Sequence, residues 1–106
     1  MICDRGTIVV VPFPYTDRSQ TKRRPALILS GRTFNQNGHS LIAMITTSGS
    51  WPLDITFDWA AAGLATASLI RMKLFTLDNR FIIRVLGNLA QPDMEAVDHN
   101  LQRMLV

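Results

Sequence analysis

The sequence predicts a mainly β protein of the α+β class that ends in one α-helix. Six short segments rich in β-branched or alternating apolar residues precede residue 90, and turn residues separate them. The last segment changes to helical spacing. A chain of 106 residues with this order is expected to form a single domain over residues 1–106, a small and strongly bent sheet or barrel with the helix packed on it.

The first strand and the loop after it are predicted from a change in residue type. Residues 7–13 (TIVVVPF) are mostly β-branched, which favours a strand, and Gly6 opens it. Residues 14–24 are polar and are predicted to form a loop. A loop of about ten residues is long for a compact domain, and such loops are often functional.

The middle of the chain is predicted to contain three more strands. Residues 26–30 and 40–46 have the composition of buried strands, and the Asn-Gln-Asn-Gly turn signal at 35–38 separates them. Residues 53–59 alternate between apolar and polar side chains, which is typical of a half-exposed strand. The apolar side of that strand would comprise Ile55, Phe57 and Trp59.

The last third of the chain is predicted to close the sheet and to add the helix. Residues 60–64 read as one helical turn closed by Gly63, and residues 68–74 and 80–86 as two further strands. Pro92 suits the first turn of a helix, and apolar residues then recur at helical spacing. The predicted apolar face of this helix, expected to pack on the barrel, comprises Met94, Val97, Leu101, Met104 and Leu105.

Composition limits the classes of protein to consider. Cys3 is the only cysteine, so no internal disulfide can form and a reducing compartment is expected. No window approaches the roughly 18 apolar residues of a membrane helix, and the early apolar run is too short for a signal peptide. We therefore expect a cytoplasmic protein without membrane association. The net charge is +3 with nine arginines against two lysines, a bias that suits bidentate phosphate contacts.

The most informative motif is the basic run Lys22-Arg23-Arg24, which ends at Pro25 and is followed by an apolar strand. Proline fixes its own φ and biases Arg24 toward an extended backbone, so this guanidinium starts from a structured element. Arginine keeps its charge and offers a planar fork of donors that matches phosphate. The alternative interpretation is a solvated basic turn.

The remaining chemistry consists of arginines and hydroxyls. No clustered metal ligands, nucleophile elbow or glycine-rich phosphate loop is found, so neither a metal nor another cofactor is expected. RNA cleavage suits such a set because RNA carries its own nucleophile, the 2′-hydroxyl, and requires mainly positioning and charge stabilisation. The candidates are Arg24, Arg71, Thr46, Thr47 and Ser48.

Other residues are candidates for holding RNA. Lys22 and Arg23 are expected to make sequence-independent phosphate contacts. Tyr15, in the polar loop, is a candidate for stacking on an unpaired base, with packing an equal alternative. For Phe13 and Trp51, which are also aromatic, packing in the core is the favoured prediction.

Several segments resemble the PemK/MazF-like toxins in order along nearly the whole chain. Arg5-Gly6 and the strand after it resemble the opening of that family, and residues 24–29 (RPALIL) resemble its RPVLV signature. Residues 43–46 (AMIT) are similar to its strand that ends in threonine. Residues 58–64 (DWAAAGL) and 74–78 (LFTLD) resemble a PemK-like subgroup.

The resemblance implies an SH3-like barrel of the CcdB/MazF type, a homodimer, and a metal-independent endoribonuclease that cleaves single-stranded mRNA at short sequences. It also implies a type II toxin–antitoxin role, with a cognate antitoxin that blocks the RNA groove. Carried over by position, Arg24 matches the family's catalytic arginine, Thr46 its catalytic threonine, and Arg71 a further arginine of the active site. Thr47 and Lys73 are expected to contact RNA.

The chain departs from the family at Lys73, where PemK-type members have an aspartate two residues after the last arginine. Two alternatives follow. The protein is a non-catalytic domain that binds RNA or protein, or it is a gyrase poison like CcdB. The second alternative is less favoured because the chain ends Arg103-Met104-Leu105-Val106, without the Trp-Gly-Ile anchor of those proteins. For Arg71, pairing with Asp54 or Asp58 is an equally plausible role.

Overall fold

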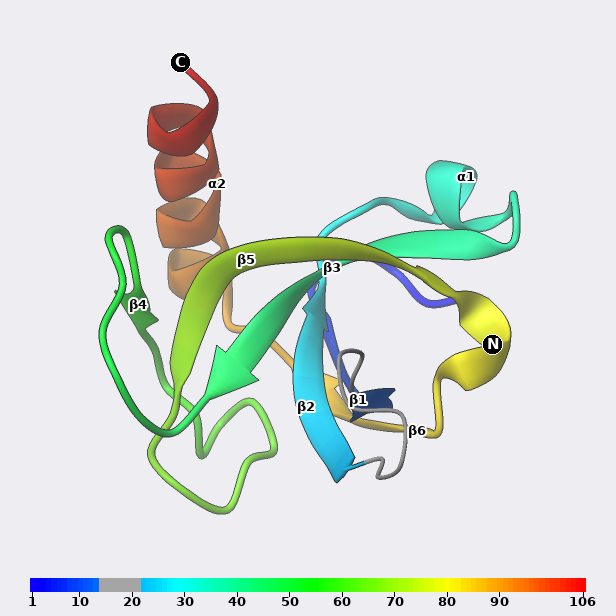
Figure 1. Ribbon diagram of the computed structural model, residues 1–106, viewed down its shortest axis with the longest axis horizontal. Coiled ribbons are helices and arrows are strands. Elements are labelled where there is room, and N and C mark those ends of the chain that lie inside the picture. The colour runs from blue at the N-terminus through cyan, green and yellow to red at the C-terminus, as the bar shows by residue number, and fades with distance from the viewer. Residues whose placement is uncertain (14–21) are drawn as a thin grey trace.

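The computed structural model describes residues 1–13 and 22–106, and in this part of the chain the strands form one curled antiparallel sheet (Figure 1). The strand order is β4-β5-β3-β2-β1-β6. The elements are β1 (Thr7–Phe13), β2 (Lys22–Ile28), α1 (Arg32–Asn35), β3 (His39–Thr46), β4 (Ile55–Thr56), β5 (Leu69–Asp78), the 3₁₀ turn η1 (Asn79–Phe81), β6 (Arg84–Asn88) and α2 (Gln91–Leu105). The prediction of a mainly β fold with a terminal helix is confirmed.

Helix α2 packs against one face of the sheet, beside β5 in Figure 1. Arg5 holds it there from the opposite end of the chain, because its guanidinium donates to the Leu29 carbonyl at 2.6 Å and pairs with Asp98. Among the described residues, none of the helices has the length and apolar character needed to cross a bilayer. The buried residues of this face include Ile8, Leu27, Ile45, Ile70, Met94 and Val97.

The opposite face has its own apolar cluster, and it carries the residues of the candidate site. Alternate side chains of each strand point to this face. Its centre is apolar, and it becomes polar toward the ends of β2 and β3. The buried members are Cys3, Val9, Val11, Ala26, Ile28, Ile42 and Ile82, with Met44, Phe75 and Leu77 packed against them.

Two buried asparagines tie the turns together on one side of the sheet. Asn79 Nδ2 donates to the Asn35 carbonyl at 2.7 Å, and Ser40 donates to Asn79 Oδ1 at 2.6 Å. Asn35 in turn donates to the carbonyls of Cys3 and Ser30. Every one of these polar groups is satisfied, which is what burial of an amide requires.

Strand β2 differs from its prediction. It begins at Lys22, inside the predicted loop, and ends at Ile28, two residues before the predicted end. Over residues 22–25 it pairs with β1 only, whereas its pairing with β3 begins at Ala26. Pro25 therefore lies in a segment with one open edge, where a missing N–H is tolerated. Residues 14–21 of the predicted loop lie outside the described part of the chain.

Three later predictions are wrong in extent. The strand predicted over 53–59 is limited to Ile55–Thr56, because Leu53 has φ of 68° and residues 59–63 form a hydrogen-bonded turn. Strand β5 extends to Asp78, past the predicted end at 74, since it pairs along the whole of β3. The strand predicted from residue 80 begins only at Arg84, after η1.

The helical prediction is confirmed except at its last residue. The apolar face packs on the sheet through Met94, Val97, Leu101 and Met104. Leu105 is 74% exposed, which contradicts its assignment to that face. It is the last helical residue and extends past the edge of the sheet, where nothing in the described part of the chain covers it.

Two glycines allow the turn after β4 to lie directly on β6. A Cβ added to Gly87 would lie 2.3 Å from the carbonyl oxygen of Ala62, and one added to Gly63 would lie 2.3 Å from that of Leu86. Gly63 also has φ of +98°, which L side chains rarely adopt. The backbone of the turn and the backbone of β6 are in direct contact here, so no flexible side chain could move to make room for an added methyl group.

We expect Gly87→Ala to lower the free energy of unfolding by about 2–3 kcal/mol, because the new methyl group must displace a strand or a turn. Gly31→Ala is the matched control, since no atom lies within 4 Å of the added Cβ and its φ is ordinary. Urea unfolding of both variants measures the difference. Equal stability of the two variants would contradict the close approach.

Candidate active site at the ends of β2, β3 and β5

The sheet register places the three side chains predicted to be catalytic on neighbouring strands and toward the same end of the sheet. The pairing of β2 with β3 ends at Ala26 and Met44. Arg24, two residues before Ala26, and Thr46, two residues after Met44, both lie just beyond that last pair. Strand β3 pairs with β5 at Met44 and Arg71. By strand alternation all of these residues point to the face opposite α2. Residues far apart in sequence therefore lie toward one end of three neighbouring strands. Thr46 and Arg71 both contact Ser48, whereas no hydrogen bond or ion pair among the described residues joins either of them to Arg24.

Arg24 is half-buried and has no hydrogen bond or ion pair with any other described residue. Its neighbour across the sheet is Val11, which offers no charge. Within the described part of the chain, the guanidinium therefore meets no acceptor and no counter-charge, and it lies on a largely apolar face. Such a cation favours an incoming anion, because a low local dielectric strengthens their attraction.

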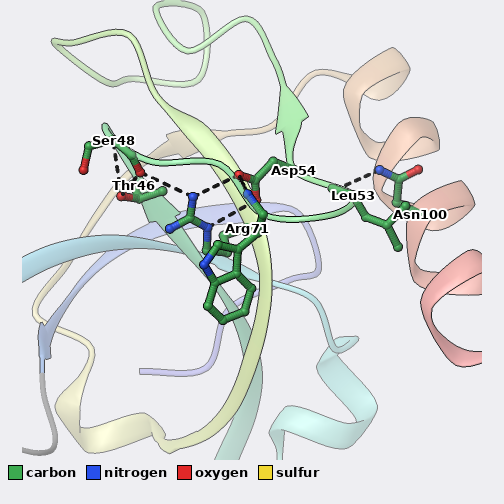
Figure 2. Close-up of polar contacts among 7 residues, drawn as sticks. Thr46, Ser48, Leu53, Asp54, Arg71 and Asn100 are labelled. Carbon is green, nitrogen blue, oxygen red and sulfur yellow. Dashed lines mark hydrogen bonds and ion pairs between the residues drawn. The ribbon is translucent and has the colours of Figure 1, made fainter.

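Arg71 is instead held by a carboxylate. Its Nε lies 3.2 Å from Asp54 Oδ1, and its Nη2 lies 2.9 Å from Asp54 Oδ2 and 3.3 Å from the Ser48 carbonyl (Figure 2). Both side chains are only 10% exposed. Of the two alternative partners considered from sequence, Asp54 is therefore the correct one. The Nη1 group makes no hydrogen bond with another described residue, and it is the part of Arg71 left to meet a ligand.

The pair also sets the charge state of Asp54. The hydrogen bonds from Arg71 hold the pKa of this carboxyl below its ordinary value, against the opposing effect of burial, and the N–H of Trp51 adds to the lowering. The pKa of Arg71 is raised by the same pairing. Asp54 is therefore ionised at neutral pH and is a poor proton acceptor. Its role is to orient Arg71.

Trp51 covers this pair from the solvent side. Its backbone N–H donates to Asp54 Oδ2 at 2.8 Å, and its ring centroid lies 5.2 Å from the Arg71 guanidinium carbon and 5.8 Å from Lys73 Nζ. The indole is 46% exposed, so the prediction that it packs in the core is wrong. The bond to Asp54 turns the loop back on itself and keeps the ring over cations, where the negative face of the indole is favourable.

Thr46 ends β3 and is 8% exposed. Its hydroxyl lies 3.4 Å from both the N–H and the carbonyl of Ser48, which is close to the limit of a hydrogen bond. These contacts are weak, and a better acceptor placed near the strand end would replace them. Thr47, the next residue, is exposed.

The predicted RNA contacts fall into two groups. Lys22 and Arg23 are exposed at the start of β2, and Lys22 shares the face of Arg24. Lys73 is half-buried on β5, with Nζ 5.9 Å from the Phe75 ring as well as near Trp51. Tyr15 and the side chain of Phe13 lie outside the described part of the chain.

Sequence reasoning missed the loop that joins β3 to β4. It treated Asp54 only as an alternative partner and placed Trp51 in the core. The polar alternation at 53–59 was the available signal, because it marked Asp54 as a residue pointing away from the core. Over residues 1–13 and 22–106, no group of three or more His, Cys, Asp or Glu side chains is arranged to hold a metal ion.

The fold is that of known bacterial toxins. The structure resembles that of MazE-MazF (Form-III) from Deinococcus radiodurans, with a TM-score of 0.82, 22% identity, and coverage of 99% of this chain and 97% of that one. A mycobacterial endoribonuclease in complex with its cognate antitoxin has a TM-score of 0.77 and 18% identity, covering 98% and 93%. The Mycobacterium tuberculosis toxin MazF-mt6 has a TM-score of 0.75 and 20% identity, and the match covers 93% of this chain and 95% of that one.

The family follows from the sequence itself. A family model described as PemK-like, MazF-like toxin of type II toxin–antitoxin system matches residues 4–105. The chain therefore belongs to this toxin family, as its motifs predicted. A comparison with curated proteins found no match.

We expect Asp54→Asn to lower the free energy of unfolding by about 2–3 kcal/mol at neutral pH, because it leaves a buried guanidinium without its counter-charge. Asp78→Asn is the control: Asp78 pairs with Arg80, whose side chain is 85% exposed, and its loss should matter much less. Urea unfolding measures both.

The pH dependence gives a second readout of the same pair. The pKa of Asp54 is lowered from 3.8 in the folded state. The ionised carboxylate therefore stabilises the folded protein fully at pH values above the pKa of Asp54 in the unfolded chain. That stabilisation is lost as the pH falls through the pKa of Asp54 in the folded protein. The gap between wild type and Asp54→Asn should therefore narrow on going from neutral pH to about pH 3. A constant gap would mean that the charge of Asp54 does not contribute.

Proposed function

We propose that this toxin is a metal-independent endoribonuclease that cleaves single-stranded mRNA at specific short sequences. The observation that carries the proposal is the guanidinium of Arg24, which has no counter-charge among the described residues and lies on the same face and toward the same end of the sheet as Thr46 and Arg71. One structural neighbour is an endoribonuclease in complex with its cognate antitoxin.

In the proposed reaction the 2′-oxygen attacks the adjacent phosphorus, a P–O2′ bond forms and the P–O5′ bond breaks. The 2′-hydroxyl loses its proton and the leaving 5′-oxygen gains one, giving a 2′,3′-cyclic phosphate and a 5′-hydroxyl. Negative charge accumulates on the non-bridging oxygens during this step. Arg24 stabilises that charge, the Thr46 hydroxyl holds the phosphate in line, and the Nη1 group of Arg71 supplies a second cationic contact.

The rest of the strand is held by charge and stacking. Lys22 and Arg23 lie where neighbouring phosphates would pass, and Lys73 and Thr47 border the same end of the sheet. The exposed Trp51 ring provides a flat surface for one unpaired base.

A protein partner is proposed on the same grounds. Structural neighbours include MazE-MazF complexes, so we propose a cognate antitoxin for this chain as well. Its binding segment would be acidic with apolar residues, because it must compete with RNA for the cations around Arg24. The toxin acts where mRNA and antitoxin are found, in the cytoplasm.

A non-catalytic binding domain is the second candidate. It is favoured by Lys73, which stands where PemK-type relatives have an aspartate, and by Asp54, which neutralises Arg71. Such a domain would bind RNA with equal affinity in the wild type and in Thr46→Ala, and neither would cleave it.

We expect Arg24→Ala to reduce the cleavage rate of a mixed-sequence RNA in EDTA by about 100- to 1000-fold, because it removes the main stabilisation of the phosphorane charge. Thr46→Ala should reduce the rate at least about tenfold. Arg103→Ala is the control, since Arg103 is an exposed arginine in the last turn of α2, away from this site.

Intact RNA with the wild type would defeat the proposal, as would undiminished cleavage by Arg24→Ala. Mapping of the product ends checks the chemistry, since attack by the 2′-hydroxyl leaves a cyclic phosphate.

We further propose that the toxin is a homodimer formed through the exposed apolar residues near β6. Phe81, Ile83 and Val85 occupy alternate positions and are 53%, 37% and 47% exposed. Ile83→Glu should shift the protein to a monomer in analytical ultracentrifugation, because a charge in an apolar contact is costly. Leu105→Glu, a similar change at the exposed end of α2, should not. A dimer that survives Ile83→Glu would contradict this surface.

A further inference from the structure

A pocket of about 290 Å³ opens beside the candidate active site, in the angle between β3, β4 and the turn that follows β4. We name it the hydroxyl pocket. Its wall includes two aromatic side chains and three hydroxyls and carries no charged group. The pocket is lined by Thr47, Thr56, Phe57, Trp59, Ala67, Ser68 and Leu69.

The sheet register places this pocket next to Thr46. Thr46 pairs with Leu69 on β5, and Leu69 pairs with Thr56 on β4. Both of these partners line the pocket, and so does Thr47, the residue after Thr46. One residue further, the Ser48 carbonyl accepts from Arg71. The chain just after β3 therefore borders both the pocket and the cationic site.

The lining suits a planar group with a polar edge. The hydroxyls of Thr47 and Thr56 are on exposed residues and make no hydrogen bond with other described residues. Ser68 donates its own proton to the Thr66 carbonyl at 2.8 Å, which leaves its oxygen as an acceptor. Phe57 and Trp59 supply the apolar wall. Unpaired bases are recognised by this combination of aromatic contact and hydrogen bonds to the base edge.

Size and charge narrow the choice of occupant. The volume lies at the lower end of the about 300–1,000 Å³ typical of small-ligand sites, enough for one ring system and too little for a folded peptide segment. An acidic side chain of an antitoxin would find no cation in the wall. The cations stand on the other side of Thr46, where the backbone phosphate of the same strand would lie.

We propose that the hydroxyl pocket binds one unpaired base of the RNA, beside the phosphate contacted by Thr46, and contributes to the choice of cleavage sequence. The proposal rests on RNA being the ligand of this toxin. Stacking and edge contacts of this kind discriminate between bases by about tenfold or more.

The first test is binding without cleavage. The four 2′-deoxy homopentamers, which lack the nucleophile, are added to the full-length wild type while the indole N–H resonance of Trp59 is followed by NMR. We expect at least one base to move this resonance. Thr47→Val together with Thr56→Val, which removes two exposed hydroxyls with little change in shape, should weaken that binding by about tenfold. Thr66→Val is the control, because Thr66 is an exposed threonine in the loop before β5 and does not line the pocket.

The second test is the cleavage sequence. Mapped cut sites should lose preference at a single position in the double valine variant and keep it in Thr66→Val. A Trp59 resonance that responds to a base in a protein that cleaves no RNA supports the pocket and defeats the nuclease. Active enzyme with an unmoved Trp59 resonance and an unchanged sequence preference overturns the pocket proposal alone. A resonance moved only by an acidic peptide with apolar residues assigns the pocket to a protein segment and also overturns the proposal.

Discussion

The ion pair between Asp54 and Arg71 organises the open end of this fold. It joins the loop after β3 to the start of β5, and Trp51 closes over it. The same loop also contacts α2, because the Asn100 side chain donates to the Leu53 carbonyl at 2.9 Å (Figure 2). One carboxylate therefore determines where a guanidinium, an indole and the wall of a neighbouring pocket stand. Both partners are nearly excluded from water, so separating them would leave a buried charge.

This arrangement divides the cations of the site into two kinds. Arg71 is neutralised and fixed, whereas Arg24 is half-buried without a counter-charge among the described residues. A fixed donor helps to position a ligand, and an uncompensated one supplies most of the attraction for an anion. Lys73 adds charge next to Trp51.

The short stretch after β3 serves both proposed ligand sites. Thr46 faces the cations, Thr47 lines the hydroxyl pocket, and the Ser48 carbonyl fixes Arg71. Adjacent residues of this stretch therefore border both proposed sites. The two glycines at the contact of the turn with β6 keep the far wall of that pocket close to the sheet.

The sequence alone determined the family, the mainly β class, the first strand and the C-terminal helix, because each depends on local residue type or period. It also singled out Arg24, Thr46 and Arg71 as candidate site residues, through the basic run before Pro25 and the resemblance of its motifs to the family. Only the tertiary structure decided which of them are neutralised, since Asp54 reaches Arg71 through a loop whose path no local pattern specifies. The same holds for the exposure of Trp51, the length of β5 and the hydroxyl pocket. Each is produced by pairing between segments distant in the chain, and such contacts leave no periodic signal in the sequence.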